Sequence, residues 1–387
     1  MRSRLTSVVA LLLLATLAHA AKQVTIGQVE QMLSADRGLS DDVVSGQLAG
    51  LTLTERVTAE RFAAWQALFP GARSQHMLLI LADESAFHPL PASELSPDPP
   101  PSLTAENKIF DAALEYANRT IHNLPNFLAV RQTLHFQTNQ DSLDAVMGQA
   151  RYEAGFAKQD AGSTCELVGL DLAPLAFTGQ FSAPVTYRDG EELLNGRAAA
   201  PAMPGFTTSG EFGPILAIVL GDARQSSIVW GYWQRRGDTR LAVFRYRVPA
   251  AKSHYAVDVG ILQSRPAYHG EIAVDPGSGS IFRISIVSDP AKLFEPASAI
   301  VIEYGPTILG SRAYMVPLHG VALGRIPVPP GVRTGSTTVV PVQNYLNDVT
   351  FAHYRLFRAD ARILSDEESR QLRDKTPAPA ASAPQPQ

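Results

Sequence analysis

The sequence predicts an α+β protein in which a large curved antiparallel sheet, a half-barrel, wraps around one or two helices and is preceded by a small all-helical module. Residues 24–86 carry helix caps and helical spacing, a proline-rich stretch follows, and strand-like segments separated by glycine turns fill most of the remainder. We therefore place the helical module at residues 22–88, a connector at 89–103 and the half-barrel domain at 104–363.

Helix signals recur through the predicted module. Thr25 and Gln28 have the spacing of a capping box, and Pro70-Gly71 is a helix stop. Further helices are expected at three places: after Ser40, after Thr58 and across residues 77–81. The proline-rich composition of residues 89–101 then favours an extended connector.

Two helices are expected within the half-barrel domain. Thr104 can cap a helix that runs to about Leu124, and its apolar stripe comprises Phe110, Leu114, Ala117, Ile121 and Leu124. Ser209 can cap a second helix, residues 209–222, whose nearly continuous apolar composition predicts burial on the concave side of the sheet. Residues 150–161 predict a weaker third helix.

Strand-like segments make up most of the domain. Phe244 and Tyr246 alternate with Arg245 and Arg247, so one face of the sheet should be apolar and the other wet. Turn residues at 189–190, 236–237, 275–279 and 309–311 predict local antiparallel hairpins. The expected strands are 128–136, 185–187, 228–233, 241–248, 255–261, 271–274, 281–287, 300–304, 314–323 and 349–357.

The two ends of the chain predict export and a disordered tail. Arg2 and Arg4, an apolar stretch over residues 8–17 and Ala18-His19-Ala20 have the layout of a signal peptide, residues 1–20, cleaved after Ala20. No cysteine stands there to carry a lipid, and no later apolar stretch approaches the roughly 20 residues of a membrane-spanning helix. We expect a periplasmic or secreted protein without a transmembrane segment. Residues 376–387, rich in Pro, Ala and Gln, predict disorder.

Composition narrows the partners. Of the 387 residues 45% are hydrophobic and 18% are charged, and the formal net charge is −4 without a run of either sign. A basic nucleic-acid-binding face is therefore not supported, and we expect no nucleic acid partner. Cys165 is the only cysteine, so it forms no disulfide within the chain, and we interpret it as a structural thiol.

Three strand phrases resemble a known group. From Leu241 to Phe357 the chain reads RLAVFRYRVP, then GEIAVDPGSGSIFRISI, then IVIEYGPTILGSRAYMVPLHGVAL. The succession of strands, glycine turns, tyrosine and proline resembles that of the LolA/LppX/RseB group of bacterial envelope proteins, and also that of uncharacterised exported proteins of acidobacteria. The resemblance implies a half-barrel whose concave face closes over helices and often holds a lipid-like ligand. The helical module is an addition to that pattern, and no functional residue carries over.

Aromatic residues on the predicted strands are the candidate ligand-binding set. A concave sheet face that its helices do not fill leaves an apolar pocket, whereas a filled core would use the same side chains. The candidate cavity-lining residues are Trp230, Tyr232, Phe244, Tyr246, Tyr255, Phe282 and Tyr304.

No catalytic motif accompanies these features. His269 and Glu271, two apart on a strand, would point the same way as an acid–base or metal pair, with His319 or His353 as a conceivable third group. A solvated sheet face explains this pair, and also His254 with Asp258, more simply. We expect no catalytic residue, no metal and no cofactor.

These observations favour an exported, non-catalytic envelope protein that binds an apolar, lipid-like ligand or a protein partner through the concave sheet face. The alternatives are a secreted hydrolase with an unrecognised site and a structural interaction module with a filled core.

Overall fold

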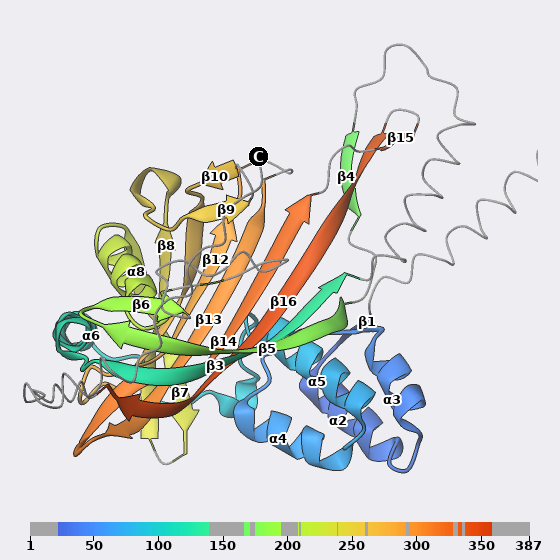
Figure 1. The fold of residues 1–387 in the computed structure, drawn as a ribbon, viewed down its shortest axis with the longest axis horizontal. Helices are drawn as coiled ribbons and strands as arrows, with labels where there is room; N and C mark the ends of the chain where they lie inside the picture. Colours follow the sequence, from blue (N-terminus) through green and yellow to red (C-terminus); the bar gives the residue numbers. More distant parts are fainter. Residues whose placement is uncertain are drawn as a thin grey trace, which may run out of the picture.

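The computed structural model describes residues 22–138, 166–170, 175–194, 208, 210–237, 239–259, 262–291, 295–327, 332–334 and 337–357. The predicted signal peptide, the helix predicted at 150–161, Cys165 and the predicted tail lie outside these residues. Within them the protein is mixed α+β, with one large, open sheet and helices on both of its faces (Figure 1). The predicted fold class is confirmed. Among the described helices, none has the length and apolar character needed to cross a bilayer.

The large sheet contains twelve of the described strands, ten of them in the order β6-β5-β3-β16-β14-β13-β12-β11-β8-β7, while β4 and β15 pair with β16. Neighbours on the main path are antiparallel. The strands are β3 (Phe127–Thr138), β4 (Glu166–Leu170), β5 (Leu175–Arg188), β6 (Glu191–Leu194), β7 (Ser227–Arg236), β8 (Thr239–Val248), β11 (Ala267–Val274), β12 (Ile281–Asp289), β13 (Ala297–Leu309), β14 (Arg312–Pro327), β15 (Val332–Thr334) and β16 (Thr337–Leu356).

The predicted hairpin turns are confirmed. Gly190, Gly237, Gly279 and Gly310 all have positive φ, and they connect β5 to β6, β7 to β8, β11 to β12 and β13 to β14. On the main path of the sheet, the least local neighbours are β3, its first strand in the sequence, and β16, its last. The last strand, β16, therefore joins the β3-β5-β6 part of the sheet to the hairpins from β7 to β14, and β6 and β7 are the two open edges.

The predicted strand 255–261 is wrong as a member of the large sheet. The chain leaves the sheet after Val248 through a short turn, η2 (Ala250–Lys252), and β9 (Val257–Val259) pairs only with β10 (Leu262–Ser264). Tyr255 precedes that hairpin, and its side chain is buried in the core. Residues 255–261 alternate between apolar and polar, as a strand does, although the backbone has already left the large sheet at Val248.

The concave face of the sheet is packed against α6 (Leu103–Asn123) and α8 (Pro214–Arg224). Phe110, Leu114 and Ala117 of α6 are buried there, as the predicted stripe requires. The predicted caps are wrong: Ser102, not Thr104, accepts a hydrogen bond from Ala105 N, and Gly213, not Ser209, precedes α8. The helix begins at Leu103 because the proline run ends at Pro101.

The helical module contains α2 (Ile26–Ala35), α3 (Asp41–Leu48), α4 (Ala59–Leu68) and α5 (Ala72–Ser85). The Thr25–Gln28 capping box is confirmed. The prediction that the module is all-helical is wrong, because β1 (Lys22–Val24) and β2 (Leu51–Leu53) form a parallel pair. Three-residue strands are too short to carry a readable alternation.

The module packs against the opposite, convex face of the sheet. Ile80 of α5 joins Phe136, Leu175 and Leu346 in one apolar cluster. The chain from the module to α6 lies against the edge strand β7: Ser96 N donates to Trp233 O at 2.9 Å, and Trp233 Nε1 donates to Pro99 O at 2.9 Å. The helices thus cover both faces, α6 and α8 the concave one and α2–α5 part of the convex one (Figure 1).

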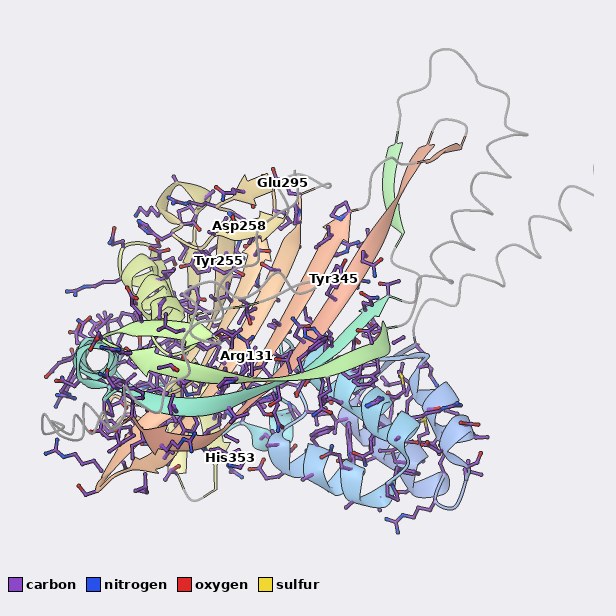
Figure 2. The ribbon with its side chains drawn as sticks, viewed as in Figure 1. Arg131, Tyr255, Asp258, Glu295, Tyr345 and His353 are labelled. Carbon is purple, nitrogen blue, oxygen red and sulfur yellow. The ribbon has the colours of Figure 1, made fainter. Side chains whose placement is uncertain are left out.

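Buried ions hold the segment that leads into α8. Arg131 of β3 (Figure 2) lies 3.3 Å from Glu211 Oε1 and donates to Thr208 O at 2.9 Å. Glu192 of β6 accepts from Gly210 N at 3.2 Å. Burial and the negative charge of Glu211 raise the pKa of Glu192 to about 8.

The turn between β11 and β12 yields a stability prediction. A Cβ on Gly279, whose φ is +74°, would lie 2.4 Å from Ala112 O of α6, so Gly279→Ala should lower the free energy of unfolding by about 2 kcal/mol or more. Gly277→Ala, in the same turn, meets only a contact of 3.4 Å and is the matched control. Urea denaturation followed by circular dichroism measures both; equal midpoints for the two variants would contradict the close packing of this turn on α6.

Glu192 predicts a pH dependence of stability. The unfolded chain loses the proton of Glu192 near its ordinary pKa of 4.5, whereas the folded protein keeps it up to about pH 8. The free energy of unfolding contributed by this group therefore falls as pH rises through that window. Glu192→Gln should stabilise the protein relative to the wild type more at pH 8.5 than at pH 5 in thermal melts. The exposed neighbour variant Glu191→Gln should show no such difference, and a pH-independent effect of Glu192→Gln would contradict the assignment.

Candidate functional site

The structure brings five of the seven candidate aromatic residues together on the concave face. Trp230, Phe244, Tyr246, Tyr255 and Tyr304 all belong to the cluster that packs on α6 and α8. Phe244 contacts Phe110 of α6 with ring centroids 5.6 Å apart, and Trp230 with centroids 5.7 Å apart. A crevice beside Tyr304 has a volume of about 10 Å³, room for a single water molecule. Among the described residues, these aromatic side chains pack in the space between the sheet and its helices.

The tyrosine hydroxyls in this cluster are engaged with the protein. Tyr246 donates to Ser285 O at 2.6 Å and Tyr304 donates to Glu211 O at 3.2 Å. The Tyr255 hydroxyl lies 2.8 Å from Ser298 Oγ. Burial raises the pKa of Tyr255 to about 12. The hydroxyls therefore serve as satisfied buried groups of a core.

Tyr232 and Phe282 lie on the convex face instead. The pairing of β7 with β8 shifts between Trp230 and Tyr232, and the pairing of β11 with β12 shifts between Ala273 and Val274. Each irregularity turns the following side chains to the other face. Tyr232 and Phe282 pack on Leu241, Val243 and Ala273 there.

A cavity of about 710 Å³ lies between the helical module and the convex face. Its walls are largely apolar, with Glu84, Arg325 and Asn344 among the polar residues that line it. Tyr345 of β16 also lines it (Figure 2). The apolar lining comes from α3, β2 and α5 on one side and from β5, β12, β13 and β14 on the other: Leu48, Leu51, Met77, Ile80, Leu81, Leu175, Val287, Ala297, Ala299 and Leu323.

A second hollow of about 530 Å³ adjoins this apolar cavity. Val287 lines both, so the two share a wall on β12. Arg245, Arg247 and His269 line the second hollow together with Glu271. We call it the basic cleft, because its exposed guanidinium groups outnumber the single carboxylate of Glu271.

A row of charged side chains crosses the convex face. Neighbouring strands from β8 to β16 each contribute one member, and the sign alternates from strand to strand. Arg245 Nε lies 3.3 Å from Glu271 Oε1, Glu271 Oε2 lies 3.7 Å from Arg283, and Arg283 is opposite Glu303 in register. We call the following set the charged row: Arg245, Glu271, Arg283, Glu303, His319 and Asp348.

The histidine end of the charged row is compact. His319 Nε2 lies 2.6 Å from Asp348 Oδ2, and His319 Nδ1 lies 3.8 Å from Glu303 Oε2. Burial opposes ionisation of Glu303, but the positive charge of His319 holds the pKa of Glu303 at about 2. Burial likewise opposes protonation of His319, but the hydrogen bond to Asp348 and the negative charges around the ring raise its pKa well above the usual range.

Two residues of the helical module, Arg56 and Asp83, contact the charged row. Arg56 Nη1 lies 3.7 Å from Glu271 Oε2, and Arg56 donates to Tyr232 Oη at 3.4 Å. Asp83 of α5 faces His319 and Asp348, and Arg283 donates to Ala86 O just after α5. Burial and the charge of Arg56 lower the pKa of Arg283 to about 10. The module and the sheet therefore meet through buried ionic groups.

The predicted His269–Glu271 pair lines one cleft, but each residue has its own partner. His269 Nδ1 lies 3.0 Å from Asp289, while Glu271 accepts from Tyr232 Oη at 2.9 Å. His319 is engaged with Asp348 and Glu303. Asp258 is exposed, and the partner of His254 is Asp222, at 2.6 Å. The structure thus divides the predicted histidine–carboxylate groups into separate pairs.

Sequence reasoning missed Arg56, Asp83, Glu303 and Asp348. Glu303 and Asp348 are lone charged residues within apolar strand segments, a signal that marks a strand position needing a partner. Arg56 and Asp83 carried no comparable signal, because the face on which they lie depends on how the module docks.

The two arginines on Glu271 predict a contrast in stability. Arg283 is 8% exposed, and Arg283→Ala would leave Glu271 partly buried with less compensation, lowering the free energy of unfolding by about 3–5 kcal/mol. Arg245 contacts the same carboxylate but is 54% exposed, so Arg245→Ala should cost only about 0–1 kcal/mol. Chemical denaturation measures both variants. Equal, small losses would show that the charged row does not fasten the module.

Comparisons with known proteins assign no family to this chain. No protein-family model matches the chain, and no curated protein does. A solved domain, described as a putative outer membrane lipoprotein-sorting protein domain from Vibrio parahaemolyticus, matches 69% of this chain and 98% of its own, with 6% identity and a TM-score of 0.31.

Proposed function

We propose that this protein is an exported, non-catalytic envelope protein that binds an apolar, lipid-like molecule with an anionic end. The single observation that carries the proposal is the apolar cavity of about 710 Å³ between α5 and the sheet, with the basic cleft beside it. Ligand sites typically occupy roughly 300–1,000 Å³, are mostly apolar and carry a few polar groups that orient the ligand.

The cavity suits an acyl chain because both of its walls are aliphatic. Leu81 and Met77 of α5 line it on one side, and Ala299 and Leu323 on the other. Burying each CH₂ of an alkyl chain contributes about 0.8 kcal/mol. A chain of ordinary length would bind here without a directed polar contact along its length.

The basic cleft suits the charged end of such a molecule. Arg245 and Arg247 are exposed, so their guanidinium groups are free of the desolvation that burial imposes. Guanidinium groups bind carboxylates and phosphates through two parallel hydrogen bonds. Because Val287 lines both spaces, we propose that one amphiphile places its chain in the apolar cavity and its anionic end in the basic cleft.

This geometry favours the convex face over the concave face expected from the sequence. The concave aromatic residues pack on α6 and α8, with room for one water molecule beside Tyr304. The helical module, which the LolA/LppX/RseB pattern lacks, supplies one wall of the apolar cavity on the convex face.

The proposal predicts that filling the cavity abolishes lipid binding. Ala299→Trp places an indole in the apolar cavity and should reduce the affinity for a fluorescent fatty acid at least tenfold. Arg247→Glu should weaken the same anionic probe but not its methyl ester. Ile308→Trp is the matched control, since Ile308 lies on the same strand, is 68% exposed and is not part of the cavity wall.

Native mass spectrometry and lipid extraction of the gently purified chain identify the natural ligand. A probe that binds Ala299→Trp as tightly as the wild type, but is lost from Trp230→Glu in a folded protein, would place the ligand on the concave face. The absence of any bound lipid or probe would leave a structural interaction module.

A further inference from the structure

Three side chains from separate elements converge at the histidine end of the charged row. Asp83 lies on α5, His319 on β14 and Asp348 on β16, and one ligand atom from each lies within 4.8 Å of the others. Asp83 is 3% exposed and Asp348 is 6% exposed. Two buried carboxylates and a partly buried imidazole therefore converge on one point.

One of these groups is unsatisfied. Asp83 Oδ2 is fully enclosed and has no hydrogen-bond partner in the structure. Leaving a buried carboxylate oxygen without a partner is unfavourable, and a second carboxylate beside it adds repulsion. A cation at this point would satisfy the oxygen and offset the repulsion.

We propose that Asp83, His319 and Asp348 bind a divalent transition-metal ion. Two carboxylate oxygens and one imidazole nitrogen form a donor set typical of Zn²⁺ and Mn²⁺ sites. Three protein ligands leave a further coordination position for water or another ligand.

Glu303 is the positioning residue of this site. His319 directs Nε2 to Asp348, within the ligand set, and Nδ1 to Glu303 on the neighbouring strand. A metal-bound histidine is neutral and donates its other N–H to a carboxylate, which fixes the ring. Glu303 stands in that place, with its carboxylate 3.8 Å from Nδ1.

The bound ion would connect the module to the sheet. Asp83 approaches from the module, whereas His319 and Asp348 belong to two paired strands. Metal binding should therefore raise the thermal midpoint of the full chain, because the ion binds only the docked arrangement.

Calorimetric titration of the full, chelator-treated chain with ZnCl₂ and with MnCl₂ tests the site. We expect one ion per chain, at least a hundredfold weaker binding in His319→Gln and Asp348→Asn, and a 10- to 100-fold loss in Glu303→Gln. His254→Gln is the matched control: His254 also pairs with an aspartate at 2.6 Å, on another part of the protein, and this variant should bind as the wild type does.

Circular dichroism establishes that each variant is folded. If His319→Gln or Asp348→Asn unfolds, the wild type still decides the question through the visible spectrum of bound Co²⁺, which reports nitrogen ligation, and through the rise of its thermal midpoint with Zn²⁺. No saturable binding of any of the three ions to the wild type, or equal affinities in folded His319→Gln and wild type, would overturn the proposal.

Discussion

The burial of alternating charges between the helical module and the sheet is the constraint on which the rest of the structure depends. An arginine and a carboxylate removed from water must find each other, and Arg283 and Glu271 do so on the paired strands β11 and β12, and Arg56 and the carbonyl of Ala86 close over them. Apolar packing alone would allow the module to slide along the sheet. The charged row specifies one docking position, and with it the walls of the apolar cavity.

The two faces of the sheet differ in how closely the helices pack on them. On the concave face, α6 and α8 pack on strands β7, β8 and β11 to β14 in one apolar core. On the convex face, ionic groups and a few apolar contacts hold the module, and the cavities lie between these points of attachment. Dense packing leaves no room for a ligand. Space for one arises where two units meet through a limited set of contacts.

Much of this architecture follows from local sequence. Gly279 and Gly310 lie at turns, Phe244 alternates with charged neighbours, and the α6 stripe has helical period, so the fold class and hairpins could be predicted. The face of Tyr232 could not, because it depends on a bulge that breaks the strand alternation. The convex-face cavity and the meeting of Asp83 with His319 depend on docking between distant segments, and no spacing in the sequence encodes it.

The pairing of β3 with β16 has a consequence for how the chain folds. Gln343 Nε2 donates to Thr138 O across 205 positions of sequence, and β16 is the only described strand that joins β3, β5 and β6 to the hairpins from β7 to β14. The intervening hairpins can form from local contacts as soon as they are synthesised. The two parts of the sheet can pair only through its final strand, β16. Until that strand, which ends at residue 356, has been synthesised, β14 is an unpaired edge.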